Sequence, residues 1–230
     1  MSNRYFSQSV FEFLKELGLN NDKPWWEANK ERYLTTIREP ALDFVTDFGE
    51  RLKEISPRFV ADARVNGGSL MRPYRDMRFA KGEPYKTNVG IHFRHEQGQD
   101  VHAPGFYLHI EPGQNFAGVG LWSPETRVAR AIRQAINDDP AGWSNAAHSD
   151  SFTATWEIGS HTEDRLKRVP RELDPGHPYP DDLRLKSFTA GTRLTQKSIT
   201  SGKFADELFT TYASAGPYAR FLCAAVGVPF

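Results

Sequence analysis

Residues 88–122 read NVGIHFRHEQGQDVHAPGFYLHIEPGQNFAGVGLW, and this stretch decides the fold because apolar residues alternate in three short runs. Such alternation is typical of strands with one buried face. The turn-rich segments EQGQDVHAPG and PGQN separate the runs, so we predict three consecutive strands in an antiparallel meander. The residues expected to face the core are Val89, Ile91 and Phe93, then Phe106, Leu108 and Ile110, then Ala117, Val119 and Leu121.

Helical patterns flank this stretch on both sides. Residues 7–19 and 22–37 carry helix start and stop signals, and residues 41–55 form a third helix after an interruption at Pro40. Residues 123–138 form another helix, capped by Ser123, and a last helix over residues 204–227 is expected to break at Gly216. Residues 151–160 are a further candidate strand. The sequence therefore predicts one α+β domain over residues 1–230, with an antiparallel sheet of at least three strands covered by N-terminal and C-terminal helices.

The composition excludes several classes of protein. The chain has 29 basic and 29 acidic residues, which argues against binding nucleic acid or acidic membranes through a broad basic surface. The single cysteine, Cys223, excludes an internal disulfide and lies in an apolar run where a buried position is expected. No apolar run approaches the ~20 residues that span a bilayer, and the N-terminus is too polar for a secretory signal. We therefore expect a cytoplasmic protein with no membrane partner.

The residues that alternate with the core positions form a second face of the predicted sheet. This face carries Asn88, His92 and Arg94 on the first strand, Tyr107, His109 and Glu111 on the second, and Phe116, Gly118, Gly120 and Trp122 on the third. Two glycines on one strand face indicate that another group approaches closely. That group is either a ligand or a packed helix. We expect the helix, and the tryptophan-rich segment near Trp25 is the candidate.

Three side chains of this face could also form a metal site. His92, His109 and Glu111 make a two-histidine, one-carboxylate set if the strands pair in the required register. A polar, exposed face is the more common arrangement, so we assign no metal and leave the cofactor unassigned.

A cluster of cations precedes the sheet in residues 72–88, RPYRDMRFAKGEPYKTN. The cations are Arg72, Arg75, Arg78, Lys81 and Lys86, and the only acidic residues among them are Asp76 and Glu83. Guanidinium groups suit phosphate and carboxylate ligands because they offer a planar fork of donors. Asp76 could orient an arginine or accept a proton. The alternative is a buried salt-bridge network that joins the helices to the sheet.

The same segment carries a family resemblance. RPYRDMRF followed by PYKTN resembles the signature of the domain-of-unknown-function 2461 family, an Arg-x-x-Arg-Asp-x-Arg-Phe core. The likeness extends from about residue 6 to residue 228 and includes the N-terminal helices with their Asn-Asn turn, GFYLHIEP, GVGLWSP and the proline-rich residues 166–188. The resemblance implies no particular activity. It does imply that the matched positions matter: Arg72, Arg75, Asp76, Arg78, Phe79, Tyr85 and Lys86.

One departure from the family pattern falls inside the cluster. Family members often carry an Asp-Lys pair between Arg-Phe and Pro-Tyr-Lys, and this chain has Gly82 and Glu83 there, apparently with one residue fewer. If that pair is catalytic, the activity of this chain is in doubt. If the pair only closes a turn, Gly82 can close the turn in its place. A second basic loop, residues 164–180, could form a lid over the cluster. We expect the alternative, in which the loop packs on the surface in contact with solvent.

These observations support three hypotheses. The first is a binder or enzyme for a small anionic ligand, if an enzyme then a hydrolase or phosphoryl-transfer type. Its catalytic residues would be Asp76, Arg75 and His109, and its ligand-binding residues Arg72, Arg78, Lys81, Tyr85, Lys86, His92, Glu111 and Trp122. The second is a non-catalytic module that binds a protein or nucleic acid through the aromatic and basic residues. The third is that the arginine cluster only stabilises the fold.

Overall fold

The computed structural model describes residues 5–78, 82–98, 103–159 and 165–230, and its centre is an antiparallel sheet. Within these residues the sheet has six strands in the order β1-β2-β3-β4-β6-β5. Their bounds are Phe59–Val60 (β1), Val89–His95 (β2), Gly105–Ile110 (β3), Phe116–Leu121 (β4), Glu157–Ile158 (β5) and Phe188–Arg193 (β6). The predicted meander is confirmed as β2–β3–β4, and β5 is the short strand that forms within residues 151–160.

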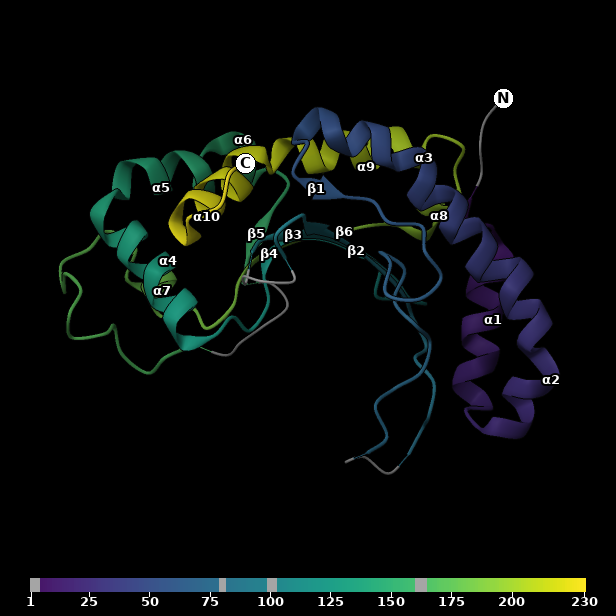
Figure 1. Cartoon of the computed structure of the whole chain (residues 1–230). Coiled ribbons are helices and arrows are strands. Elements are labelled where there is room, and N and C mark those ends of the chain that lie inside the picture. The colour runs from purple at the N-terminus through teal and green to yellow at the C-terminus, as the bar shows by residue number, and fades with distance from the viewer. Residues whose placement is uncertain (1–4, 79–81, 99–102, 160–164) are drawn as a thin grey trace.

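The helices lie before, between and after the strands along the chain. Their bounds are Gln8–Leu19 (α1), Lys23–Tyr33 (α2), Glu39–Ile55 (α3), Thr126–Asp138 (α4), Pro140–Ala147 (α5), Asp150–Thr153 (α6), Pro180–Leu183 (α7), Gln196–Ile199 (α8), Phe204–Ser214 (α9) and Gly216–Val226 (α10). Figure 1 shows α3 and α9 crossing one face of the sheet, α1 and α2 at one end, and α4, α5, α7 and α10 at the other. The predicted α+β class and the break at Gly216 are confirmed.

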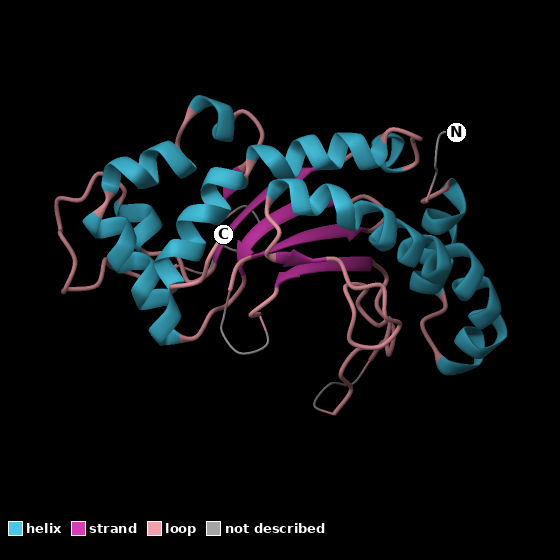
Figure 2. Cartoon of the chain, turned by 45° about the horizontal axis from the view of Figure 1, so that its top comes forward, coloured by secondary structure: helices cyan, strands magenta, loops and turns pink. Residues whose placement is uncertain are grey.

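The core lies between the sheet and the helices that cross it. All nine residues predicted to face the core are at most 4% exposed. Phe48 of α3 lies 5.3 Å from Phe93 of β2, and Tyr212 of α9 lies 4.8 Å from Phe106 of β3, measured between ring centroids. Figure 2 shows these helices lying across the strands. Aromatic contacts of this kind add to the area that each ring buries, so one face of the sheet is fully sealed.

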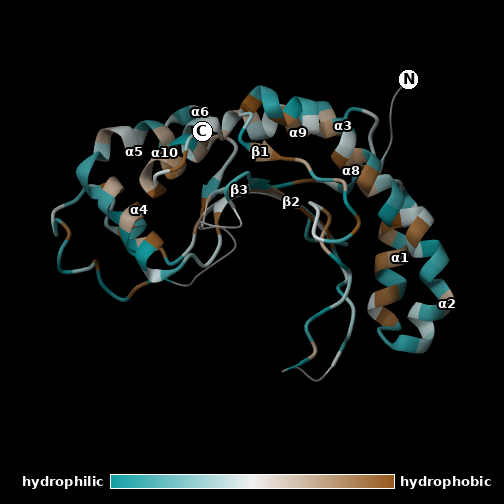
Figure 3. Cartoon of the chain, viewed as in Figure 1, coloured by the Kyte–Doolittle hydropathy of each residue, from teal (hydrophilic) through white to brown (hydrophobic). Residues whose placement is uncertain are grey.

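The N-terminal helices differ from the prediction at Pro40. The chain does not leave the helical conformation there, because a π-turn over Leu34–Arg38 joins α2 to α3 and Pro40 occupies the first turn of α3. A proline removes one backbone donor, and a wider turn just before it accommodates the loss. In Figure 3, α1 carries more hydrophobic residues than α2, in keeping with the burial of Val10, Phe11, Phe13, Leu14 and Leu17 on α1.

The predicted cap of α4 is wrong. The helix begins at Thr126 with Glu125 as its N-cap, and Ser123 lies in the preceding turn with a φ of 45°. The backbone N–H of Ser123 donates to the side-chain oxygen of Ser187 at 2.9 Å. Ser123 therefore turns the chain between β4 and α4 and does not cap the helix.

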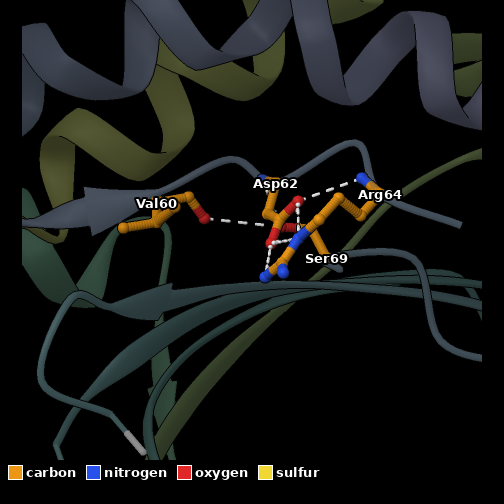
Figure 4. A network of polar contacts seen from close by, with 4 residues as sticks. All are labelled: Val60, Asp62, Arg64 and Ser69. Atoms are coloured by element: carbon orange, nitrogen blue, oxygen red, sulfur yellow. Dashed lines mark hydrogen bonds and ion pairs between the residues drawn. The ribbon is translucent and has the colours of Figure 1, made fainter. Parts of the chain in front are cut away.

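A polar network fixes the segment that follows β1 (Figure 4). The Ser69 hydroxyl accepts from the backbone N–H of Asp62 at 2.9 Å and donates to the carbonyl of Val60 at 3.4 Å, while Arg64 pairs with the Asp62 carboxylate. Beyond this network the chain runs along β2, where the N–H of Met71 donates to the Gly90 carbonyl at 2.9 Å. The network therefore determines where residues 72–88 leave the sheet.

Residues 72–78 and 82–88 lie side by side as a ribbon, and we call the segment 72–88 the arginine hairpin. Tyr74 and Tyr85 pair across it, and in Figure 1 it extends away from the sheet. Its base is held by Trp26 of α2, which stacks on Tyr85 with the rings 4.4 Å apart and 14° from parallel. Asn21 adds two hydrogen bonds of 3.0 Å to the backbone of Tyr85, one to its carbonyl and one from its N–H. Aromatic stacking and one asparagine anchor the hairpin.

We predict that Trp26→Ala lowers the free energy of unfolding by about 4 kcal/mol, because Trp26 is 1% exposed and truncation leaves a cavity. Asp76→Ala should leave the melting temperature almost unchanged, since its carboxylate is exposed and pairs with Arg78 within the same ribbon. Denaturant unfolding of both variants beside the parent protein measures this. An equal loss in the two variants would mean that the arginine cluster holds the fold together.

Candidate functional site

The face of the sheet opposite the core lines a groove of about 1240 Å³, which we call the open-face groove. Residues of β2, β3, β4 and β6 contribute to it, and so do Met71, one turn of α4, and Ala225 and Val226 of α10. In the described part of the chain, no residue of α1, α2 or α3 lines it. The predicted cover by the tryptophan-rich segment is wrong, because Trp26 packs against Tyr85 of the arginine hairpin.

The strand register arranges the open face of the sheet in three rows across β2, β3, β4 and β6, and most of their residues line the groove. The rows are Gly90, His109, Phe116 and Arg193; then His92, Tyr107, Gly118 and Gly191; then Arg94, Gly105, Gly120 and Thr189. The polar face predicted from the sequence is therefore a continuous surface. Polar side chains gather on β2 and β3, and glycines gather toward β4 and β6.

A chain of hydrogen bonds runs along β3 on this floor. The Tyr107 hydroxyl lies 3.2 Å from Nδ1 of His109, and Nε2 of His109 lies 3.0 Å from Oε2 of Glu111. The other carboxylate oxygen of Glu111 accepts from the Thr87 hydroxyl at 3.0 Å. The His109 ring also stacks on Phe116, 4.7 Å away and 13° from parallel. These contacts hold the His109 ring from every side, and a fixed ring is what proton transfer requires.

The partners of His109 determine its tautomer. The side-chain nitrogen of Asn88, 3.5 Å from Nδ1, can only donate, so Nδ1 is an acceptor. The proton then lies on Nε2 and is donated to Glu111. Burial and the Glu111 charge raise the pKa of Tyr107 to about 12, so its hydroxyl stays protonated and donates to Nδ1. The order Tyr107, His109, Glu111 is therefore a directed relay.

His92 lies one row from His109, beside Tyr107. Burial, with the nearby charge of Arg94, lowers the pKa of His92 to about 4. Its Nδ1 accepts from Nε of Arg94 at 3.3 Å. His92 is therefore neutral near pH 7, and its Nε2 side lies against Gly105 of β3.

The register also separates the proposed metal ligands. His92 pairs with Tyr107, whereas His109 pairs with Gly90. Across the described ranges, no group of three His, Cys, Asp or Glu side chains is placed to hold a metal ion. The His92, His109 and Glu111 set therefore acts as a hydrogen-bonding surface in this arrangement.

Two arginines line the groove, Arg94 from β2 and Arg127 from α4. Both are exposed, and neither forms an ion pair with a carboxylate in the part of the chain that the structure describes. The groove thus has two guanidinium groups available to an anion. Sequence reasoning placed Arg94 on this face and did not include it in the site, and Arg127 was read only as a helix residue.

The cations of the arginine hairpin lie outside the groove. Arg78 pairs with Asp76 at 2.5 Å, and this contact lowers the pKa of the Asp76 carboxyl. Arg75 donates to the Tyr85 carbonyl at 3.1 Å and lies 3.7 Å from Glu83. Asp76 and Arg75, both predicted as catalytic, thus make local contacts within the ribbon and not with His109. No described residue of the hairpin lines the groove.

Lys86 and Arg72 are the hairpin cations with the strongest claim to an anion. Burial, together with the charges of Arg72 and Arg75, lowers the pKa of Lys86, as expected where like charges gather. Lys81 and Phe79 lie outside the described residues. Gly82, in the shortened turn, has a φ of 138°, a conformation that favours glycine.

The remaining predicted residues divide between the two regions. Trp122 lines the groove and is 64% exposed, and Glu111 and His92 line it as well. Tyr85 is a buried anchor. The second basic loop packs on α4, where Nε2 of His177 lies 3.0 Å from the Ile136 carbonyl. Figures 1 and 2 place that loop at the end of the molecule away from the arginine hairpin, so it is not a lid over it.

We predict that nitrogen-15 NMR finds the proton of neutral His109 on Nε2, and that Tyr107→Phe shifts His109 toward a mixture of tautomers by removing a donor at Nδ1. His177 is an internal control. Its Nδ1 accepts from the backbone N–H of Tyr179 at 3.1 Å, so its tautomer should not respond. A proton on Nδ1 of His109 in the parent protein would contradict the relay.

We predict that His92 makes the protein less stable in acid. Its folded pKa of about 4 lies below the ordinary value of 6.5, so the unfolded chain binds the proton more readily, and stability falls as pH drops from 6.5 toward 4. Between pH 7 and 4.5 the parent protein should lose about 2 kcal/mol more than His92→Gln. Urea unfolding at both pH values measures the difference, and equal losses would show that His92 is not held neutral.

The comparisons with known proteins identify the family of the chain. No match to the chain was found among the curated proteins or the solved structures. In the described residues no helix has the length and apolar character needed to cross a bilayer. A family model described as conserved hypothetical protein, DUF2461, matches residues 9–221, nearly the whole chain. The chain belongs to the DUF2461 family.

Proposed function

We propose that the open-face groove binds a small molecule carrying a phosphate or carboxylate group, and that Tyr107, His109 and Glu111 exchange a proton with it. The observation that carries this proposal is the hydrogen-bonded relay on the groove floor, 3.2 Å from the Tyr107 hydroxyl to His109 and 3.0 Å from His109 to Glu111. Polar groups that converge in a concave site are the usual mark of a binding or active site.

The relay suits general base chemistry. Nδ1 of His109 accepts the proton of the Tyr107 hydroxyl as that hydroxyl takes one from water or from a ligand hydroxyl. Glu111, bonded to Nε2, stabilises the imidazolium that forms. The ligand group loses one proton and His109 gains one. A base of this kind serves a hydrolase or a phosphoryl-transfer enzyme.

The anionic group of the ligand is assigned to Arg94 and Arg127. Both line the groove, and neither has a carboxylate counterion among the described residues. The arginine hairpin is the alternative position for an anion, since Arg72 and Lys86 share one end of the ribbon and the pKa of Lys86 is lowered.

A second candidate function rests on the hairpin itself. Tyr74 is 44% exposed within this basic ribbon, and an exposed ring beside arginines suits stacking on nucleic-acid bases. The hairpin would then bind a protein or nucleic acid without catalysis. Such binding weakens steeply with salt because each phosphate contact releases counterions.

Thermal-shift measurements with phosphorylated and carboxylated metabolites test the proposal. A ligand at 100 times its dissociation constant should add about 2.7 kcal/mol to stability. We predict that Arg94→Gln and Arg127→Gln each weaken a stabilising ligand by roughly tenfold or more, the loss expected when a charge-assisted hydrogen bond is removed. Arg72→Gln is the matched control, since Arg72 is also an exposed arginine, and it should leave binding unchanged.

The same experiment separates the alternatives. Loss of binding in Arg72→Gln alone would place the anion on the hairpin and contradict the groove assignment. Absence of any stabilising compound, with salt-sensitive binding of an oligonucleotide, would favour the non-catalytic module.

A further inference from the structure

Three strand glycines, Gly105, Gly118 and Gly120, line the open-face groove on neighbouring strands. Gly118 pairs with Gly191 across β4 and β6, and Gly120 pairs with Gly105 across β4 and β3. Gly118 and Gly120 are neighbours on the same face of β4. The His92 ring lies against Gly105, so the part of the floor without a covering side chain is at Gly118 and Gly120.

Two of these glycines are required by the fold. A side chain at Gly120 would collide with the carbonyl of Phe188, and its φ of 120° favours glycine. A side chain at Gly105 would collide with the ring of His92.

Gly118 has no such requirement. A Cβ placed on it would meet its nearest neighbour, Cβ of Tyr107, at 3.7 Å, which is ordinary van der Waals contact. Its φ does not lie in the left-handed region. Glycine inside a strand is destabilising relative to alanine. Because the fold does not explain the choice and Gly118 lines the groove, this glycine indicates the close approach of a ligand.

One polar group at the rim of this area lacks a partner. The hydroxyl of Thr189, which pairs with Gly120, is inaccessible to solvent and makes no hydrogen bond in the described structure. A buried hydroxyl without a partner is unfavourable unless a ligand or water satisfies it.

Trp122 stands at the other side of this area. It lines the groove and is 64% exposed. The next residue, Ser123, has a φ of 45°, which is uncommon for a residue other than glycine. This strained turn sets the direction of the chain directly after an exposed aromatic ring.

We propose that the glycine floor binds a flat heterocyclic ring, so that the ligand of the groove is a ring-bearing anion with the chemistry of a nucleotide. This inference rests on the proposed function and names its ligand class. The ring lies over Gly118 against bare peptide groups, Trp122 covers its edge, and the Thr189 hydroxyl hydrogen bonds to a ring heteroatom. The anionic group then reaches Arg94 or Arg127.

The sparse polarity of the floor selects a ring over a sugar. Each face of a sugar carries hydroxyl groups that need several hydrogen-bonding partners. The face of an aromatic heterocycle has no such groups, and its polar atoms lie at the edge. A floor of glycine backbone with polar groups at its rim, Tyr107 beside Gly118 and Thr189 beside Gly120, matches the second pattern.

The test uses the four common nucleoside monophosphates, their nucleosides, and ribose 5-phosphate, which has the anion without the base. Binding is measured by thermal shift and calorimetry on the full chain. We expect at least one monophosphate to bind more tightly than ribose 5-phosphate. Gly118→Leu fills the space above the floor and should weaken that monophosphate on the order of tenfold or more, while leaving ribose 5-phosphate binding unchanged.

Two further variants guard against loss of folding. Thr189→Val keeps the shape and removes the hydroxyl, so it should bind the monophosphate about 3- to 10-fold more weakly with an unchanged or higher melting temperature. Gly118→Ala should fold as well as the parent protein, because its methyl group meets only ordinary contacts.

Two outcomes would overturn the ring assignment. One is a set of monophosphates that bind no better than ribose 5-phosphate, and the other is full monophosphate binding in both Gly118→Leu and Thr189→Val. If ribose 5-phosphate still binds and Arg94→Gln abolishes its binding, the anion site of the proposed function survives without the ring.

Discussion

The antiparallel register of β2, β3 and β4 is the constraint on which the rest of the structure depends. Because side chains alternate between the two faces of a strand, a shift of one residue would exchange the whole buried set with the polar set. The register that buries Phe93, Phe106 and Val119 under α3 and α9 is the same register that aligns His92 with Tyr107 and Gly118. Core packing therefore positions the groove, and no separate interaction is needed to do so.

The groove is joined to the arginine hairpin through backbone neighbours. Asn88 and Thr87, at the end of the hairpin, contact His109 and Glu111 directly. Tyr85, two residues earlier, stacks on Trp26. A displacement of the hairpin would therefore move Thr87 and Asn88, and through their hydrogen bonds it would move the side chains of Glu111 and His109. The arginine hairpin thus lies beside the groove and contacts its floor residues without lining it.

Sequence reasoning was strongest where the pattern is local. The alternation in residues 88–122 identified all nine core positions. It also identified the polar residues that β2, β3 and β4 place on the opposite face. It missed β6, because Phe188–Arg193 contains Thr189, Gly191 and Thr192 and alternates weakly. Thr189 was therefore not predicted as a residue of the open face. The register itself could not be read from the sequence, and so the pairing of His92 with Tyr107 and of His109 with Gly90 was not accessible.

The ion pairs of the arginine cluster could not be read from the sequence either. Charge density in a sequence does not reveal which charges already neutralise each other. Asp76 and Arg78, two residues apart, form an ion pair on the exposed ribbon, whereas Arg94 and Arg127, 33 residues apart by number, line one groove. Some cations of the hairpin are thus paired with carboxylates, whereas Arg94 and Arg127 remain available to a ligand. Long-range placement by the sheet and α4 creates that difference.

The two faces of the sheet also differ in how much their residues contribute to the stability of the fold. The core face consists of buried aliphatic and aromatic side chains. The other face carries several features that lower stability. Gly118 in a strand costs about 0.5–1 kcal/mol relative to alanine, and the unpartnered Thr189 hydroxyl costs about 1–3 kcal/mol. The positive φ of Ser123, beside the exposed Trp122, costs about 1–2 kcal/mol. His92 is held there in its neutral form as well. Departures from local stability concentrate at functional sites because selection for stability alone would remove them. Their concentration on one wall of one groove is the argument for a ligand there, and it does not depend on any single residue.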